Sequence, residues 1–196
     1  MKRETISVQM EYTLTEKGAV ITKMRGRAAE IRIPESIDGV PVIAIGEKAF
    51  AVKEEAPVAE QGEELAAELA FVEKAEEPTA MGQALQRVFL PDSIETIGAY
   101  AFSGCSALER IHLPARLTEI PQRMFDGCGA LAQVTLPAGL QAIGDYAFYG
   151  CGRLERLRLP EGVQRIGKYA FYNCRKIEEI NIPLAATDLN TGLFLN

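Results

Sequence analysis

The sequence contains a single histidine, His112, which excludes a metal site built on two or more histidine ligands. It also contains no H-E-x-x-H motif, no C-x-x-C pair and no acidic calcium-binding loop. The segment 162–169 comes close to a phosphate-binding loop, but Tyr169 stands where that loop needs a small hydroxyl side chain to hold magnesium. We therefore expect no metal, no cofactor and no catalytic residues, and an enzyme is only a remote alternative.

Long apolar runs are also missing, since none approaches the ~20 residues that a membrane-spanning helix needs. The first residues, Met1 to Thr5, lead into a mixed polar segment rather than an apolar one, so no signal peptide is visible. We therefore expect a cytoplasmic protein. The alternative is a secreted or cell-surface protein whose leader is absent from this sequence.

The formal net charge is −6, so the chain lacks the positive charge of a general nucleic-acid-binding protein. Nine acidic and two basic side chains fall within residues 51–84. Residues 51–80 are interpreted as an acidic insertion with a helix over residues 63–77. The apolar residues of this helix fall on one face, at Leu65, Leu69 and Val72. The insertion would be a helix docked on the flank of the molecule, a flexible acidic segment, or a functional helix that acts as a lid over a binding surface or binds a partner.

What the chain has in abundance is a 23-residue repeat. Aliphatic residues open successive copies at Leu85, Leu108, Leu131, Leu154 and Ile177. Prolines follow at Pro91, Pro114, Pro137, Pro160 and Pro183, and phenylalanines at Phe102, Phe125, Phe148, Phe171 and Phe194. A period of this size indicates a solenoid, in which each turn packs on the next and residues at the same offset form internal rows.

One copy shows how a turn is built. Ile111 and Leu113 alternate with Arg110 and His112, which is the period-two pattern of a half-buried strand. Pro114 ends this strand, because proline fixes φ and has no N–H for a ladder.

Glycine and cysteine occupy two further positions of the repeat. Glycine follows the second isoleucine in most copies, at Gly98, Gly144 and Gly167, where we expect a tight bend with positive φ. The cysteines share one row, at Cys105, Cys128, Cys151 and Cys174. We expect them to be buried packing residues with reduced thiols, which fits a cytoplasmic location. Disulfides or a metal site are the alternatives.

The consensus L-x-x-I-x-L-P-x-x-L-x-x-I-G-x-x-A-F-x-x-C resembles the BspA-like class of leucine-rich repeats. It departs from the commoner leucine-rich pattern, because Arg116 rather than Asn or Cys occupies the ninth position of the copy that opens at Leu108. The resemblance implies an extended right-handed solenoid, with a β-strand plus short turn or helical segments in each repeat. It also implies a binding function, often on bacterial surfaces, and no catalytic residues.

The ends of the chain depart from the regular repeat. The alternating apolar and polar residues of the segment 5–24 predict a β-hairpin, which we expect to cap the first turn. We therefore divide the chain into an N-terminal hairpin cap at residues 1–29 and a leucine-rich repeat solenoid of about six turns at residues 30–196. The last strand, within residues 177–183, is an edge that would form a homodimer if it paired with a second copy.

The outward positions of the strands form the candidate binding surface, because two side chains in each copy flank the inward aliphatic residue and point out of the expected concave sheet. The ligand-binding candidates are Arg32, Arg87, Phe89, Arg110, His112, Gln133, Thr135, Arg156 and Arg158, and the same rows also hold Glu30, Glu179 and Asn181. Arginine forks suit carboxylate or phosphate groups. The alternative is that these side chains only keep the sheet face soluble. A second candidate surface is the tyrosine group Tyr146, Tyr149, Tyr169 and Tyr172.

These observations predict a non-enzymatic protein-interaction module that binds a protein or peptide partner, acidic in character, on the concave face of a solenoid. The alternative is a fragment of a bacterial cell-surface adhesin that binds host protein or glycan.

Overall fold

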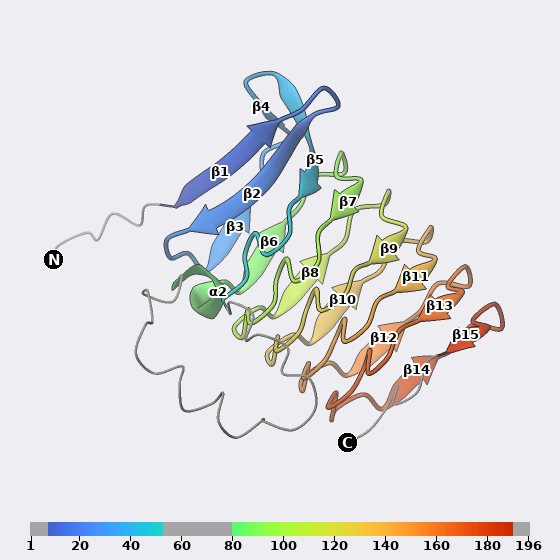
Figure 1. Ribbon diagram of the computed structural model, residues 1–196. Coiled ribbons are helices and arrows are strands. Elements are labelled where there is room, and N and C mark those ends of the chain that lie inside the picture. The colour runs from blue at the N-terminus through green and yellow to red at the C-terminus, as the bar shows by residue number, and fades with distance from the viewer. Residues whose placement is uncertain (1–7, 53–79, 190–196) are drawn as a thin grey trace, which may run out of the picture.

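The computed structural model describes residues 8–52 and 80–189, which wind into a solenoid of stacked turns (Figure 1). A three-residue strand lies on one side of each turn. These strands are β3 (Glu30–Arg32), β6 (Arg87–Phe89), β8 (Arg110–His112), β10 (Gln133–Thr135), β12 (Arg156–Arg158) and β14 (Glu179–Asn181). Neighbouring strands pair in parallel from β3 to β10, and again between β12 and β14. The predicted solenoid is therefore confirmed.

A second row of strands, which was not predicted from the sequence, forms another side of the solenoid. Its members are β5 (Val40–Ile45), β7 (Thr96–Ile97), β9 (Glu119–Ile120), β11 (Ala142–Ile143), β13 (Arg165–Ile166) and β15 (Asp188–Leu189). β5 pairs with β7, and β9, β11, β13 and β15 form one parallel sheet. Most of these strands have two residues, which is too short for an alternating pattern to be visible in the sequence.

The third side of each turn consists of turns rather than the short helices that the resemblance allowed. Backbone hydrogen bonds join this side to the next copy, as Phe125 N donates to Ala147 O and Gly127 N to Tyr149 O, both over 2.8 Å. The helix α2 (Ala80–Ala84) lies just before β6. Because two strand rows and this turn row bond between copies, the stack is held together on three sides.

The core consists of the internal rows that the repeat predicts. The phenylalanine rings stack through the solenoid, with centroids 5.3 Å apart between Phe125 and Phe148 and 5.5 Å apart between Phe148 and Phe171. The cysteine row is also buried, and all four thiols are free. Aliphatic residues from both strand rows, such as Ile111 and Ile120, fill the space between these rows.

The predicted reason for the glycines that follow the second isoleucine is wrong. Gly144 is not in the left-handed region; positive φ occurs two residues later, at Tyr146, with φ of 56°. A Cβ at Gly144 would lie 2.6 Å from Gln122 N and 2.8 Å from the carbonyl carbon of Pro121. A Cβ at Gly98 or Gly167 would also lie too close to the backbone of the preceding turn, at the amide nitrogen of Glu47 or Asp145. Glycine is therefore required because two turns approach each other closely.

The N-terminal hairpin forms as predicted, from β1 (Gln9–Leu14) and β2 (Ala19–Arg25) in antiparallel pairing. β2 also pairs in parallel with β5, and its residues Ala19, Ile21 and Met24 join the core. The hairpin therefore lies against the first turn, where a cap would lie. The boundary at residue 29 stays a prediction, as does pairing of a second copy along the last strand.

The first turn is longer than the 23-residue repeat, and its extra residues, between β3 and β5, form a small hairpin. β4 (Ser36–Ile37) pairs with the start of β5 in antiparallel orientation. Asp38 and Gly39 join them with φ of 50° and 80°, which is the backbone of a type I′ turn. The predicted acidic helix and its lid or flank position lie outside the described residues.

The row of three-residue strands has a break. Among the described strands, no backbone ladder joins β10 to β12, although β11 and β13 of the same two turns are paired. Val134 and Leu136 of this turn are only partly buried, whereas Ile111 and Leu113 one turn earlier are buried. The row of three-residue strands is therefore divided into two sheets, β3 to β10 and β12 to β14.

Candidate functional site

The exposed side of the three-residue strands, here called the arginine face, brings the predicted binding residues together. The central residue of each strand points into the core, and the first and third residues are exposed. Within each of the two sheets the strand register places the first residues in one row and the third residues in another, and the 23-residue repeat continues both rows across the break. The first row contains Glu30, Arg87, Arg110, Gln133, Arg156 and Glu179, and the second contains Arg32, Phe89, His112, Thr135, Arg158 and Asn181. Their predicted exposure on one face is confirmed, and their role in binding stays a prediction.

Two arginines at the β3 end of this face already have partners within the protein. Arg87 Nε lies 3.8 Å from Glu30 Oε2, in an ion pair whose side chains are about half exposed. The guanidinium carbon of Arg32 lies 4.3 Å from the centre of the Phe89 ring. Both contacts are weak because they are open to solvent, but each reduces the freedom of its arginine.

Three arginines further along the face have no such partner. Arg110, Arg156 and Arg158 make no ion pair and no side-chain hydrogen bond with any described residue. Arginines elsewhere on the surface are paired, as Arg116 with Glu95 at 3.0 Å and Arg165 of β13 with Glu119 of β9 at 3.1 Å. The unpartnered guanidinium groups each present five N–H donors, in a geometry that fits a carboxylate.

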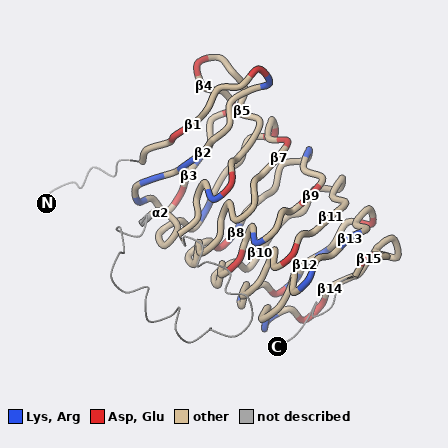
Figure 2. Tube along the Cα trace, in the orientation of Figure 1, with Lys and Arg blue, Asp and Glu red and all other residues tan. Residues whose placement is uncertain are grey.

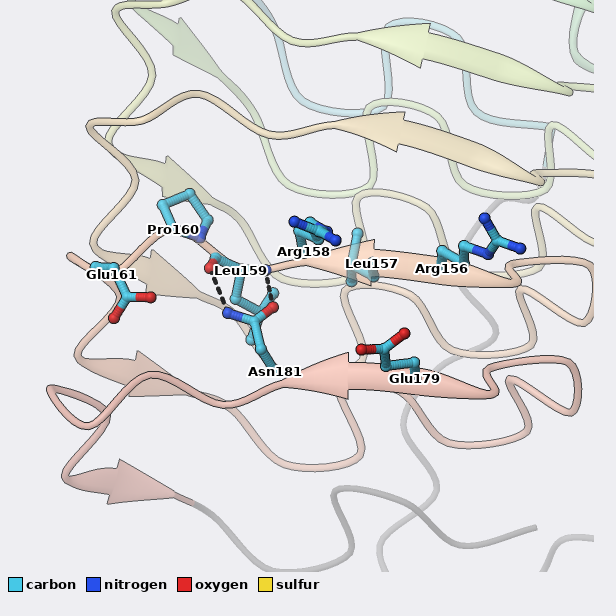
Figure 3. A pocket seen from close by; sticks show the side chains of 8 residues that line it. All are labelled: Arg156, Leu157, Arg158, Leu159, Pro160, Glu161, Glu179 and Asn181. Carbon is cyan, nitrogen blue, oxygen red and sulfur yellow. Dashed lines mark hydrogen bonds between the residues drawn. The ribbon is translucent and has the colours of Figure 1, made fainter.

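A pocket of about 500 Å³ lies over β12 and β14 (Figure 3). It is lined by Arg156, Leu157, Arg158, Leu159, Pro160, Glu161, Glu179 and Asn181. Arg156 and Glu179 are opposite each other in the ladder, yet they form no ion pair, and Figure 3 shows their charged groups lying apart. Glu179 therefore does not neutralise the guanidinium group of Arg156 in an ion pair.

Asn181 fixes one end of this pocket. Its Nδ2 donates to Leu159 O and its Oδ1 accepts from Leu159 N, each over 2.9 Å (Figure 3). The amide thus takes the place of a backbone strand and satisfies both polar groups of Leu159. This role, and the contribution of Pro160 and Glu161 to the lining, were not predicted. No signal in the sequence shows them, because proline is regular at this offset and the amide bonds depend on side-chain geometry.

Charge is arranged unevenly along the face. Figure 2 shows basic residues on β12 beside acidic residues of the next turn, while β10 between β8 and β12 carries no charge. Glu30 and Glu179 lie at the two ends of the first row. The positive charge without a partner is therefore concentrated in the middle of the face, on β8 and β12.

The cysteine row offers no chemistry to a ligand. Each thiol donates to the carbonyl of a phenylalanine in the preceding turn, as Cys151 Sγ does to Phe125 O over 3.2 Å. Burial raises the pKa of Cys105 to about 12, and it raises the pKa values of Cys128 and Cys151 well above the usual range. A thiolate is the reactive form, so these residues are structural.

The tyrosine group lies away from the arginine face, on the side formed by turns. Tyr149 and Tyr172 stack with centroids 5.1 Å apart, and Tyr146 and Tyr169 lie 5.2 Å apart. The guanidinium carbon of Arg123 lies 4.3 Å from the centre of the Tyr146 ring. The rings therefore pack on one another between turns and are only partly exposed.

The described part of the chain contains neither a cluster of metal ligands nor a membrane-spanning helix. Within residues 8–52 and 80–189, no group of three or more His, Cys, Asp or Glu side chains is placed to hold a metal ion. No helix in the same ranges has the length and hydropathy of a membrane span.

Comparisons with known proteins agree with this architecture. A family model described as a BspA type leucine rich repeat region, in six copies, matches residues 80–196. The chain is similar to the crystal structure of a leucine rich repeat protein from T. pallidum, with 30% sequence identity and a TM-score of 0.71, over 94% of this chain and 80% of that one. A leucine-rich repeat protein from Bacteroides ovatus has 24% identity and a TM-score of 0.69, over 93% of this chain and 42% of that one. That similarity shows the fold alone. No curated protein matches the chain.

Proposed function

Because this chain belongs to the BspA-type leucine-rich repeat family, we propose that it is a protein-binding module whose partner docks on the arginine face through acidic groups. Repeat solenoids present extended surfaces of this kind for binding. The observation that carries the proposal is the set of three exposed arginines, Arg110, Arg156 and Arg158, that lack a partner among the described residues.

Unpaired arginines favour an acidic partner for a physical reason. An exposed ion pair contributes only about 0–1 kcal/mol, so one arginine cannot specify a partner. Several arginines on a rigid sheet act together, because their backbone positions are already ordered before binding. Charge complementarity of this kind also raises the association rate and makes it sensitive to salt.

We propose that the chain acts by binding rather than by catalysis. The thiols that would serve as nucleophiles are buried, and burial raises the pKa of Cys105 to about 12. The single imidazole, on His112, lies exposed on β8 with Gln133 and Thr135 on the neighbouring strand and has no carboxylate opposite it in the ladder. Neither arrangement activates a nucleophile.

The proposal is tested by binding of polyglutamate to the immobilised chain at low and high salt. We expect binding that weakens as salt rises, and that is mostly lost in the triple variant R110Q/R156Q/R158Q. The matched control is R25Q/R116Q/R165Q, which removes the same charge from arginines that are paired elsewhere. Equal loss in both variants would mean that net charge alone governs binding, and the arginine face would then not be the site.

A second arm identifies the natural partner. The wild-type chain and the two triple variants serve as baits in an extract of the native cell. A protein that the wild-type chain and the control variant retain, and that the R110Q/R156Q/R158Q variant does not, supports the proposal. A partner retained equally by all three baits contradicts it.

A further inference from the structure

The spacing of the free arginines along the arginine face carries information about the shape of the partner. Arg110 and Arg156 lie in the same row, with the uncharged Gln133 between them. Paired strands are about 4.8 Å apart, and β11 and β13 keep the turns of β10 and β12 paired, so two strand steps separate these arginines by about 10 Å. A matching ligand therefore presents two negative groups about 10 Å apart on one side.

Chain conformations differ in whether they meet this requirement. In a β-strand, side chains on one side recur every second residue, at about 6.6 Å. On an α-helix, residues three or four apart lie about 5–6 Å from each other, and residues seven apart return to one side after about 10.5 Å. A polyproline II helix has three residues per turn and rises about 3.1 Å per residue, so every third side chain returns to one side after about 9.3 Å. The polyproline II repeat and the seven-residue repeat of a helix are therefore both close to the arginine spacing, whereas the strand repeat is not.

The backbone of the face also argues against a partner that adds a strand. From β6 to β8 each strand is paired on both sides, so these strands offer no free edge on which a partner could add a strand. Among the described strands, β10 and β12 are unpaired on the sides that face each other, but a segment that crosses the strands runs across these edges rather than along them, so side chains hold it. A polyproline II backbone needs no ladder, because its polar groups are fully solvated, and it loses less entropy on binding than a flexible chain does.

An aromatic ring is available at the end of the same surface. Phe89 is 37% exposed at the end of β6, which pairs with the strand β8 that carries Arg110. Prolines of polyproline II segments pack on exposed aromatic rings, and the ring of Phe89 is already held by Arg32 at 4.3 Å. The unpartnered arginines and the ring of Phe89 together therefore fit a partner segment that is both acidic and rich in proline.

We propose that the partner presents an acidic, proline-rich segment in the polyproline II conformation, which crosses the strands and places an acidic side chain at every third residue. One acidic group pairs with Arg110, the next pairs with Arg156 and Arg158, and a proline packs on Phe89. This inference rests on the proposed function, since it concerns the partner of the same face.

The test compares three probes on the whole chain by isothermal titration or fluorescence anisotropy. The first is a peptide of Glu-Pro-Pro repeats, the second has the same composition with all its glutamates contiguous, and the third is a heparin oligosaccharide. We expect the repeat peptide to bind most tightly. Arg110→Gln or Arg156→Gln should weaken its binding about two- to fivefold each, as the loss of an exposed ion pair predicts. Arg165→Gln on β13 is the matched control and should change nothing.

A gain of charge gives a second, independent readout. Gln133→Arg fills the neutral position between Arg110 and Arg156, on an exposed site that does not contribute to the core. It should strengthen binding of the contiguous peptide more than binding of the repeat peptide, which reduces the preference between them. If it strengthens both equally, the spacing argument is wrong.

The remaining outcomes separate the inference from the proposed function. If both peptides bind equally well and both need the arginines, the inference is overturned while the proposed function stands. If neither peptide binds and the heparin oligosaccharide binds through the same arginines, the partner is a glycan and both proposals are overturned. If no probe responds to the R110Q/R156Q/R158Q substitutions, the arginine face is not a site for anionic groups.

Discussion

Alanine substitutions at Gly144 and Gly129 should change stability in opposite directions, although the chemical change is the same. At Gly144 the new Cβ would lie 2.6 Å from Gln122 N and 2.8 Å from the carbonyl carbon of Pro121, closer than unstrained contacts allow. Both atoms belong to the backbone of the preceding turn, so no side chain can rotate away. Gly144 N also donates to Ile120 O over 2.8 Å, which holds the two turns together at this point.

The expected loss at Gly144 is about 1–3 kcal/mol, as for other overpacked positions in a close-packed interior. In a domain of this size each kcal/mol shifts Tm by about 2–4 °C, so the melting temperature should fall by about 2–12 °C. At Gly129 nothing lies within 4 Å of the added Cβ, and φ is not in the left-handed region. Alanine there restricts only the unfolded chain, so it should stabilise the fold by about 0.4–1 kcal/mol.

Urea unfolding followed by circular dichroism measures both changes, and the slope of each transition shows whether the turns still unfold together. Gly152→Ala is a further control, because that position is equally open. If Gly144→Ala is as stable as the wild-type chain, or if it behaves like Gly129→Ala, then close approach of the turns does not explain the glycine. Positive φ would not explain it either, since Gly144 does not adopt it.

Three further predictions concern the internal rows. Phe148→Ala should lower the free energy of unfolding by about 3–5 kcal/mol, because this buried ring is stacked between Phe125 and Phe171. Phe89→Ala on the surface should lower it by about 1 kcal/mol or less. Equal midpoints of the two variants in urea would contradict this prediction. All four thiols should react with a thiol reagent only after unfolding, and fast labelling of the native chain would show that the cysteine row is accessible. Stability should fall as pH rises above about 9, because burial raises the folded-state pKa of Cys105 to about 12 while an unfolded thiol loses its proton near the ordinary value of 9.0. Cys105→Ala should make this decline less steep, and an unchanged slope would mean that another group causes it.

The solenoid could be predicted from the sequence because its core positions recur at a fixed period. Each copy places an aliphatic residue, a proline and a phenylalanine at the same offsets, and every one of these has a fixed place in the turn. The row of two-residue strands was missed for a physical reason. A strand such as β9 (Glu119–Ile120) has no room for alternation, and it exists only because the neighbouring copy supplies its hydrogen-bond partners.

The glycines show a different limit of reasoning from a sequence. The position of Gly144 in the repeat indicates that a side chain is not tolerated, but two causes lead to the same residue. Positive φ would require glycine locally, whereas close approach requires it because of a turn 23 residues earlier. The residue two positions after this glycine's place in the repeat has positive φ, and it is Lys48, Tyr100, Arg123, Tyr146 or Tyr169 in successive copies. Only the packing of neighbouring turns distinguishes the two causes.

The location of the candidate site was predictable from the sequence, but which of its arginines already have partners within the protein was not. Because side chains alternate along a strand, the sequence places all five arginines of the candidate site on the exposed face. It does not show that Arg87 is paired with Glu30 and Arg32 stacked on Phe89, while Arg110, Arg156 and Arg158 have no partner among the described residues. These differences depend on rotamers and on charges that lie in other turns.

Binding and stability can be altered separately in such a molecule, because they depend on different positions of the same strand. The central residue of β8, Ile111, is buried and follows the repeat, whereas its neighbours Arg110 and His112 are exposed and differ from copy to copy. Stacking constrains the first kind of position and leaves the second kind free. A substitution such as Gln133→Arg therefore changes the charge spacing of the arginine face while the rows that hold the turns together stay intact. A stability measurement on that variant should give the wild-type value within about 0.5 kcal/mol. A larger loss would mean that the face is part of what holds the solenoid together, and its charges could then not be interpreted as a binding pattern alone.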